Sequence, residues 1–445
     1  HVTTRSAATI VENVRRVSEK IAIIIDTKGP EIRLTGMAAG FESGIPIEKG
    51  QLVRMKGTAE DRPLNDPTIY DAVPTGSIIL IDDGELELQV VDKADDELVC
   101  EVHNGGVIKP RKSVNIPGVP IDLPSVTDKD HEFINWAIDM DIDFIAHSFV
   151  RKKSDVLAVK KILKDRNSSI KIISKIENSE GVDNIDEILD ETYGIMVARG
   201  DLGVEIPAER IPVTQRLLVK KCIESKKPVI IATQMLHTMI EHPRPTRAEI
   251  SDVANAIYQR VDAVMLSGET ANGLYPVEAV ATMARVAREI ENDEGNNGPN
   301  IDMNVVRINN EITAQLARSA VRASINLRVK AIVIDTLSGR TGRYVAAFRG
   351  QMPVYAVCYR KSTMRQLALS YAVFCLYKKP SVSREGFLLN ILYYLEDRKW
   401  LSKEDLIVVL GGSFGAATGA SFLEIGNVLN LEHKALSQYN AYRKD

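Results

Sequence analysis

Two stretches of the sequence place charged side chains directly after runs of apolar, mostly β-branched residues. The first run ends in Lys175 and Glu177, and the second is followed by Arg199 and Asp201. An apolar run of this kind is typical of a strand that is buried on both faces of a parallel sheet. In a barrel of such strands, the residues at the carboxyl ends line the active site. We therefore expect Lys175, Glu177 and Asp201 to meet in one site.

The chemistry expected of these three side chains is metal-assisted. Glu177 and Asp201 would be carboxylates on neighbouring strand ends, with Lys175 two residues before Glu177 and on the same face of its strand. Hard oxygen ligands of this kind suit Mg²⁺, which usually takes one or two protein carboxylates and completes its shell with substrate and water. The alternative is a structural ion-pair cluster, because such clusters also gather charges at strand ends.

The composition bounds the class of protein. A chain of 445 residues exceeds one ordinary core and predicts two or three domains. Its hydrophobic fraction of 44% and charged fraction of 26% are those of a soluble globular protein. A net charge of −4 gives no reason to expect nucleic acid or an anionic membrane as a partner. The four cysteines are far apart and lack metal-site spacing, which is typical of reduced thiols in a cytoplasmic protein.

The elements that would position these residues alternate between helix and strand. A helix is predicted over residues 5–20 and a strand over 21–26, and five more strands are predicted at 143–147, 170–176, 194–198, 228–233 and 262–266. Six such units predict a parallel sheet. A closed barrel needs eight, so we favour a (β/α)8 TIM barrel whose first two strands precede His1 over an open sheet.

Two other regions differ in texture from the barrel. Residues 31–123 form short alternating runs separated by turn signals, which predicts an inserted all-β domain. Residues 291–299 read as a linker by composition, and beyond them a smaller α/β domain begins. The predicted boundaries are 1–29 and 124–297 for the barrel, 30–123 for the insert, which we expect to be a β-barrel lid, and 298–445 for the C-terminal domain.

Polar residues follow the other predicted strands as well. Oxygens of Asp26 and Thr27 could hold a monovalent cation, Ser148 could donate to a phosphate or carboxylate, and Thr233 could hydrogen-bond the reacting centre. Arg33 lies just past a Gly-Pro breaker and could face a phosphate. Each of these residues has a simple structural explanation by itself. Polar groups at nearly every strand end nevertheless favour an active site.

The chain resembles the pyruvate kinase family over essentially its whole length. Matching segments occur in order at 26–33 (DTKGPEIR), 112–115 (KSVN), 174–178 (SKIEN), 198–203 (ARGDLG), 232–235 (ATQM), 243–249 (PRPTRAE) and 265–270 (MLSGET). So many ordered matches are far more specific than one glycine motif. The resemblance implies a barrel, a β lid inserted after its third strand, and a C-terminal regulatory domain.

The resemblance also implies a reaction and a set of roles. The chain would move the phosphoryl group of phosphoenolpyruvate to ADP and give pyruvate and ATP in glycolysis. Glu177 and Asp201 would hold Mg²⁺ or Mn²⁺, and Lys175 would neutralise charge on the phosphoryl group in transit. Thr233 would sit near the enolate and help deliver a proton through water. Backbone N–H groups of Gly200 and Asp201 would bind the substrate carboxylate.

Further roles implied by the resemblance concern K⁺ and the nucleotide. Asp26 and Thr27 would be two of the K⁺ ligands, and Arg33 and Lys112 would contact the phosphates of ADP or ATP. His1 resembles the last residue of a family element, Arg-x-Asn-x-Ser/Ala-His. We therefore expect a substrate-binding arginine, further K⁺ ligands and two barrel strands to precede it.

A loop of the C-terminal domain resembles the family loop that cradles an effector phosphate. The residues concerned are Thr336, Ser338, Gly339, Arg340 and Thr341. Hydroxyl and backbone N–H groups ahead of a helix form an anion site on general grounds. The alternative is an ordinary Ser/Thr N-cap loop. Residues 411–415 match the last loop of the family loosely. Family members are usually tetramers, which predicts a cytoplasmic homotetramer.

Two other functions remain open at this point. One is a metal-dependent lyase or aldolase that works through a pyruvate enolate, since barrels with a Glu/Asp metal pair also carry out that chemistry. The inserted lid and the nucleotide-contact candidates Arg33 and Lys112 argue against it. The other is a catalytically inactive relative that serves as a binding protein, against which the intact Lys175, Glu177 and Thr233 argue.

Overall fold

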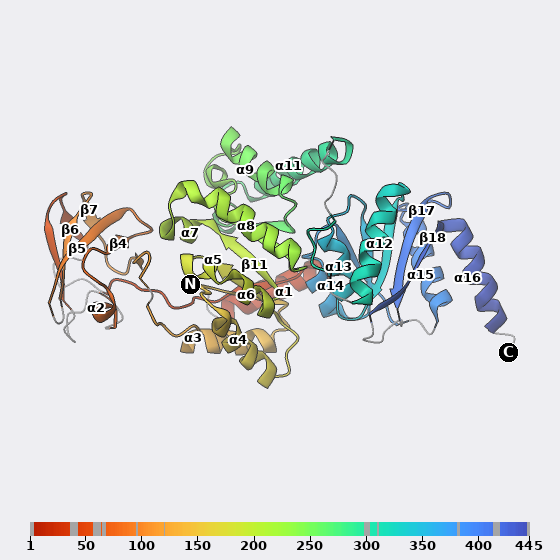
Figure 1. The fold of residues 1–445 in the computed structure, drawn as a ribbon, viewed down its shortest axis with the longest axis horizontal. Helices are drawn as coiled ribbons and strands as arrows, with labels where there is room; N and C mark the ends of the chain where they lie inside the picture. The colour runs from red at the N-terminus through yellow and green to blue at the C-terminus, as the bar shows by residue number, and fades with distance from the viewer. Residues whose placement is uncertain are drawn as a thin grey trace.

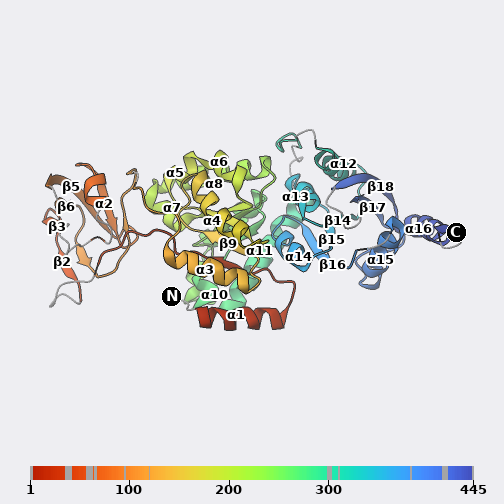
Figure 2. The ribbon, with the colours of Figure 1, turned by 90° about the horizontal axis from the view of Figure 1, so that it is seen from below.

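A computed structural model describes residues 4–35, 43–56, 64, 68–94, 97–119, 121–297, 303–308, 311–380, 383–412 and 419–442. Three units lie in a row, and the two perpendicular views agree on their order (Figures 1 and 2). We call them the β-rich unit (32–119), the central unit (4–31 and 121–297) and the C-terminal unit (303–442). His1 and residues 413–415 of the predicted effector region lie outside the described residues.

The central unit is built on six parallel strands. They are β1 (Ile24–Asp26), β9 (Phe144–His147), β10 (Lys171–Ile176), β11 (Gly194–Ala198), β12 (Val229–Ala232) and β13 (Ala263–Val264). Their order in the sheet is their order in the sequence, and every neighbouring pair is parallel. The six predicted strands are thus confirmed, although β1 begins at Ile24, three residues later than predicted. Among the described residues, β1 and β13 form the two edges of the sheet.

Helices cover the outside of this sheet. They are α1 (Thr4–Val17), α3 (Asp128–Asp139), α4 (Lys153–Asp165), α5 (Ser179–Asp183), α6 (Ile185–Glu191), α7 (Arg199–Glu205), α8 (Ile211–Glu224), α9 (Arg247–Tyr258), α10 (Gly268–Ala271) and α11 (Pro276–Asn297). Alternate strand residues point outward to the helices or inward to a smaller core that includes Phe144, Ile173 and Met196. This curled parallel sheet, sheathed in helices, has the architecture of a TIM-type barrel.

One prediction in this region is wrong. Residues 291–297 were expected to be a linker, but they form the last two turns of α11. The preceding residues of α11 are mostly Ala, Glu, Arg and Val, and an established helix extends at little cost into a polar segment. Composition alone therefore placed the helix end too early.

The β-rich unit has a hydrophobic core of its own. Its elements are β2 (Ile45–Ile47), β3 (Leu52–Lys56), α2 (Thr68–Ala72), β4 (Ile78–Ile81), β5 (Leu86–Ala94), β6 (Glu97–Val102), β7 (Gly106–Ile108) and β8 (Val114–Asn115). Every pairing among these strands is antiparallel. Arg33 bridges to Ser113 where the two connections to the central unit meet. The insert is all-β as predicted, apart from the short helix α2.

The C-terminal unit is a second α/β layer structure. Its strands are β14 (Ala331–Thr336), β15 (Val354–Cys358), β16 (Val373–Tyr377), β17 (Leu406–Gly412) and β18 (Ala420–Asn427). The order is β16-β15-β14-β17-β18, with only β18 antiparallel. The helices are α12 (Ile312–Asn326), α13 (Arg340–Ala347), α14 (Lys361–Leu367), α15 (Arg384–Asp397) and α16 (Val428–Tyr442). In the part of the chain that is described, no helix is long and apolar enough to cross a bilayer.

Buried ion pairs fix the C-terminal unit to the amino ends of the central strands. Arg365 Nε lies 2.5 Å from Asp143 Oδ1, just before β9. Arg349 Nη2 lies 2.6 Å from Asp262 Oδ2, just before β13, and both side chains of this pair are at most 5% exposed. The C-terminal unit therefore docks on one end of the barrel and leaves the carboxyl ends of the strands to face the β-rich unit (Figure 1).

Replacing Asp262 by Asn is expected to destabilise this docking. The carboxylate accepts hydrogen bonds from Arg349, from Val229 N at 3.0 Å and from Tyr371 N at 2.9 Å. Without its charge, Arg349 stays buried and uncompensated, which costs about 3–5 kcal/mol. Denaturant unfolding followed by tryptophan fluorescence measures the loss.

A matched control is Asp139→Asn, which removes the exposed pair between Asp139 and Arg166. Exposed pairs contribute about 0–1 kcal/mol, so this variant should unfold close to wild type. Equal effects of the two substitutions would contradict the importance of the buried pair.

Candidate active site

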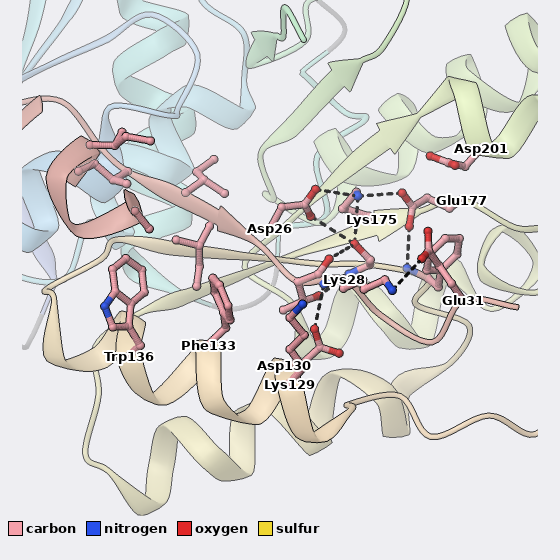
Figure 3. Close-up of a pocket in the computed structure, with 18 of the residues that line it drawn as sticks. Asp26, Lys28, Glu31, Lys129, Asp130, Phe133, Trp136, Lys175, Glu177 and Asp201 are labelled. Carbon is pink, nitrogen blue, oxygen red and sulfur yellow. Dashed lines mark hydrogen bonds and ion pairs between the residues drawn. The ribbon is translucent and has the colours of Figure 1, made fainter. Parts of the chain in front are cut away.

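The carboxyl ends of the central strands open into a cavity of about 520 Å³. Its polar wall includes Asp26, Ser148, Lys175, Glu177 and Asp201, which come from four different strand ends. Figure 3 shows Lys175 between Asp26 and Glu177, with Asp201 beside Glu177. The structure therefore brings together the three charged residues from which the sequence argument started.

Lys175 is the centre of this network. Its Nζ lies 2.9 Å from Glu177 Oε1 and 3.1 Å from Asp26 Oδ2, and it donates to Ser148 Oγ at 3.0 Å. Burial by itself would lower the pKa of Lys175, but the charges of Glu177 and Asp26 outweigh it and hold the pKa above its usual value. The ammonium group is therefore a fixed positive charge at the edge of the cavity.

Glu177 is almost completely buried, with 1% of its surface exposed. Its Oε2 accepts the backbone N–H of Phe149 at 2.6 Å, which ties the end of β10 to the turn after β9. Burial raises the pKa of Glu177 to about 7; Lys175 opposes this rise and Asp201 adds to it. Burial likewise raises the pKa of Asp201, in the first turn of α7.

These two carboxylates fit a divalent cation. A buried carboxylate beside a second one is under-compensated, which is the situation that a bound cation relieves. The described residues contain no cluster of three or more His, Cys, Asp or Glu side chains that could hold a metal. Two carboxylates with open positions for substrate and water are the arrangement that Mg²⁺ accepts.

Asp26, Thr27 and Ser148 form a small cluster of oxygen atoms next to Lys175 Nζ. Ser148 Oγ lies 3.2 Å from Asp26 Oδ1 and donates to the carbonyl of Thr27 at 2.7 Å. The Thr27 hydroxyl donates to Ala146 O at 3.3 Å and accepts the N–H of Ser148 at 3.0 Å. The hydroxyl of Thr27 thus serves the β1–β9 junction, and the oxygens of Asp26 and the Thr27 carbonyl are the better candidates for a cation.

Thr233 and Gly200 are joined by a hydrogen bond. The Thr233 hydroxyl accepts the N–H of Gly200 at 2.8 Å and donates to Ala232 O at 2.7 Å. Thr233 has a φ of 68° and Gln234 a φ of 55°, so two successive non-glycine residues are left-handed. Such residues cost about 1–3 kcal/mol each and cluster at functional sites. The predicted substrate contacts of Gly200 and Thr233 therefore lie on one hydrogen-bonded pair.

The predicted nucleotide residues line a neighbouring cavity of about 610 Å³ between the central and β-rich units. Both cavities share Glu31, Phe149 and Asp201. Arg33 Nε lies 2.6 Å from Glu31 Oε2, and Lys112 Nζ lies 2.7 Å from Asp82 Oδ1. Arg33 and Lys112 thus each form an ion pair with a carboxylate in this second cavity. Their binding of nucleotide phosphates stays a prediction.

The predicted effector loop leads into α13, whose N-cap residue Gly339 receives no capping hydrogen bond from a side chain. Thr336 Oγ1 accepts the N–H of Gly339 at 3.0 Å, and Gly339 adopts a left-handed φ of 79°. Ser338 Oγ lies 3.5 Å from the N–H of Arg340, and Thr341 is buried. The loop carries hydroxyls that bond within it and leads into the N–H groups at the start of α13, which could receive an anion, so both interpretations stay open.

Two further charged residues belong to the site region and were not predicted to have a role: Arg199, directly after β11, and Glu269, in α10. Arg199 forms an ion pair with Asp252 at 2.7 Å and donates to the carbonyl of Thr233. Glu269 is 2% exposed and accepts the N–H groups of Leu236 at 3.0 Å and Ser267 at 2.7 Å. For Arg199 the signal was a charge directly after an apolar strand, because a charge in that place must find a buried partner.

Comparisons with known proteins agree with this architecture. Residues 1–280 match the family model described as pyruvate kinase, barrel domain, and residues 314–425 match the one described as pyruvate kinase, alpha/beta domain. The chain is 44% identical over 428 residues to a pyruvate kinase of Borreliella burgdorferi, covering 94% of this chain and 88% of that protein. It is 45% identical over 428 residues to one of Geobacillus stearothermophilus, covering 94% and 72%.

A crystal structure of a pyruvate kinase from Cryptosporidium parvum superposes with a TM-score of 0.88 at 35% identity, covering 96% of this chain and 89% of that one. Both family models match, and the relatives are covered over more than two thirds of their length. The chain belongs to the pyruvate kinase family.

Proposed function

We propose the following roles for the residues of this phosphotransferase, which transfers a phosphoryl group from phosphoenolpyruvate to ADP. In that reaction the bond between phosphorus and the enol oxygen breaks, a bond to a terminal phosphate oxygen of ADP forms, and the resulting enolate takes a proton at carbon to give pyruvate. The observation that carries the proposal is the buried Lys175–Glu177 pair beside Asp201, at the wall of the cavity.

Lys175 neutralises charge on the phosphoryl group in transit. Such a transition state spreads negative charge over its peripheral oxygens, so catalysis consists mainly of positioning and fixed positive charge. The contacts of Nζ with Asp26, Ser148 and Glu177 hold it in place before substrate arrives. Ser148 accepts from this ammonium and keeps it oriented, and its single proton, now donated to the carbonyl of Thr27, would turn to the substrate on binding.

Glu177 and Asp201 hold the divalent cation, Mg²⁺ or Mn²⁺. When bound, that cation supplies positive charge to the oxygens of the substrate. Asp26 and the carbonyl of Thr27 hold K⁺, beside the network of Lys175. The pyruvate kinase family generally needs both cations, and the oxygen cluster at the ends of β1 and β9 supports the assignment of the monovalent one.

Thr233 serves the carbon that takes the proton, and the N–H groups of Gly200 and Asp201 bind the substrate carboxylate, for which the hydrogen bond from Gly200 to Thr233 has to open. The Thr233 hydroxyl, which now accepts the Gly200 N–H, passes a proton to the enolate through water. Arg33 and Lys112 bind the phosphates of the nucleotide from the adjoining cavity. The β-rich unit excludes water, which would otherwise compete for the phosphoryl group.

The requirement for ADP tests this function. We expect pyruvate release from phosphoenolpyruvate, measured with purified protein, Mg²⁺ and K⁺, to depend on ADP and to match ATP formation one for one. A metal-dependent lyase or aldolase would release pyruvate without nucleotide. A protein that binds phosphoenolpyruvate and ADP but turns over neither would be the inactive relative.

The affinity for Mg²⁺ is expected to weaken as the pH falls below about 7. In the metal-free protein, Glu177 has a pKa of about 7, so below that pH a proton occupies the ligand and must leave before the metal binds. Competition with one proton lowers the affinity by about tenfold per pH unit. Calorimetric titration with Mg²⁺ in buffers of different ionisation enthalpy measures both the affinity and the released proton. An affinity that is constant from pH 6 to 8 would contradict Glu177 as a ligand.

The remaining assignments concern the setting of the enzyme. We propose a cytoplasmic homotetramer that acts in glycolysis. Its C-terminal unit would bind a phosphorylated effector at Thr336, Ser338, Gly339, Arg340 and Thr341. The support is the family relationship together with the loop ahead of α13, in which the Thr336 hydroxyl accepts the N–H of Gly339.

A further inference from the structure

Thr233 adopts a left-handed backbone conformation that a threonine side chain disfavours. Thr233 is β-branched and left-handed, with a φ of 68°, and it is followed by a second left-handed residue. A β-branched residue rarely adopts that region, and it persists there only where surrounding contacts hold it. This conformation turns the chain sharply at the end of β12 and brings the Thr233 hydroxyl to Gly200.

The guanidinium of Arg199 binds the backbone of that turn. Nη2 donates to the carbonyl of Thr233 at 2.7 Å, and Nε donates to the carbonyl of Ala232 at 3.3 Å. Nη2 also lies 2.9 Å from Sδ of Met235. One planar fork therefore binds two successive carbonyls, which a lysine ammonium cannot reproduce with the same geometry.

Arg199 is itself fixed. Its Nη1 lies 2.7 Å from Asp252 Oδ1 on α9, and its side chain is 10% exposed. This pair balances the charge of the guanidinium and leaves the other donors for the turn. Arg199 immediately precedes Gly200, so one dipeptide contacts Thr233 twice, at its carbonyl through Arg199 and at its hydroxyl through Gly200.

We infer that Arg199 is a positioning residue for the protonation half of the reaction, because it holds Thr233 in the left-handed turn that aims its hydroxyl. The inference rests on the proposed role of Thr233 in proton delivery. Arg199 touches no reacting atom; it acts through the backbone of the residue that does. Losing the fork lets the turn relax, and a shift of about 1 Å at the hydroxyl is enough to slow proton transfer about 100-fold.

The test follows the proton step by itself. By microscopic reversibility, the groups that protonate the enolate also exchange the methyl protons of pyruvate with solvent, which proton NMR follows in D₂O with Mg²⁺, K⁺ and ATP. We expect Arg199→Gln to slow this exchange about 10- to 100-fold. Adding it to Thr233→Ala should cost less than about threefold more, because the hydroxyl that it positions is already gone.

Matched variants test whether the effect on the exchange is specific to Arg199. Arg166→Gln removes another arginine–aspartate pair of the same unit, at Asp139, and should leave the exchange unchanged. Arg199→Lys should retain part of the rate, since an ammonium can keep one of the carbonyl contacts. If Arg199→Gln fails to fold, Arg199→Lys and Asp252→Asn make the same comparison with Thr233→Ala.

The outcomes separate this inference from the proposed function. If Thr233→Ala slows the exchange but Arg199→Gln does not, the positioning role is overturned and the role of Thr233 stands. If Arg199→Gln slows the exchange equally with and without the Thr233 hydroxyl, Arg199 acts by another route and the inference is overturned. If Thr233→Ala leaves the exchange unchanged, the proposed role of Thr233 in proton delivery and the positioning role of Arg199 are both overturned.

Discussion

Replacing Lys175 by Met is expected to lower kcat about 10³-fold or more, while the KM for phosphoenolpyruvate changes less than about tenfold. The ammonium is fixed by Glu177 and Asp26 and its side chain is 13% exposed, so its charge is held in place before the substrate arrives. A charge that acts mainly on the transition state appears in kcat rather than in substrate binding. Steady-state assay of ATP formation at saturating Mg²⁺ measures both constants.

The control for this variant lies on the same strand. Lys171 begins β10, at the end opposite to Lys175, and Lys171→Met makes the same chemical change away from the cavity. We expect its kcat to stay close to that of wild type. A Lys175→Met enzyme that keeps more than a tenth of the wild-type kcat would show that the lysine is a structural member of the ion-pair cluster, which was the competing interpretation.

The sequence predicted the inner barrel strands most clearly, because β9, β11 and β12 are buried at every position whereas β1 and β13 at the edges are not. Strand β11 (Gly194–Ala198) has five buried residues in a row. A continuous apolar run of this kind is typical of a strand in a buried parallel sheet. Once those strands are recognised as parallel neighbours, their carboxyl ends must meet. The meeting of Lys175, Glu177 and Asp201 therefore followed from pattern and topology without any tertiary information.

Other features depend on contacts that a linear pattern does not contain. All five residues of strand β16 (Val373–Tyr377) are apolar, yet it lies at the edge of its sheet with exposed and half-buried positions, so its place in the sheet does not follow from its residue types. The end of α11 was misplaced because helix extension depends on the preceding turns and not on local composition. Local patterns thus identified the interior elements better than the edges and ends.

The left-handed turn at Thr233 is the clearest case at the site itself. A threonine after a strand reads as an ordinary strand residue, and its positive φ arises because Arg199, 34 positions earlier in the chain, binds its carbonyl. That contact is tertiary, so the sequence could suggest that Thr233 is polar and well placed but not how its hydroxyl is aimed. The residue type was predictable and its geometry was not.

Replacing Glu177 by Gln is expected to weaken Mg²⁺ binding at least about 100-fold and to reduce turnover about 10³-fold at fixed Mg²⁺. The amide is nearly isosteric and can still accept the N–H of Phe149, whose backbone is left-handed with a φ of 54°. The fold should therefore survive, while the charge that binds the cation and balances Lys175 is lost.

The pH dependence of the Glu177→Gln variant is a second measure of the same ligand. Because an amide carries no titratable proton, its residual Mg²⁺ affinity should lose the fall below pH 7 that burial of Glu177 produces in the wild type. The control is Glu187→Gln, an equal change of charge on α6, where the carboxylate accepts the N–H of Lys153. Competition between Mn²⁺ and Mg²⁺ followed by electron paramagnetic resonance gives both affinities. Unaltered Mg²⁺ affinity in Glu177→Gln, or an equal loss in Glu187→Gln, would remove Glu177 from the metal site and leave Asp201 to hold the cation without it.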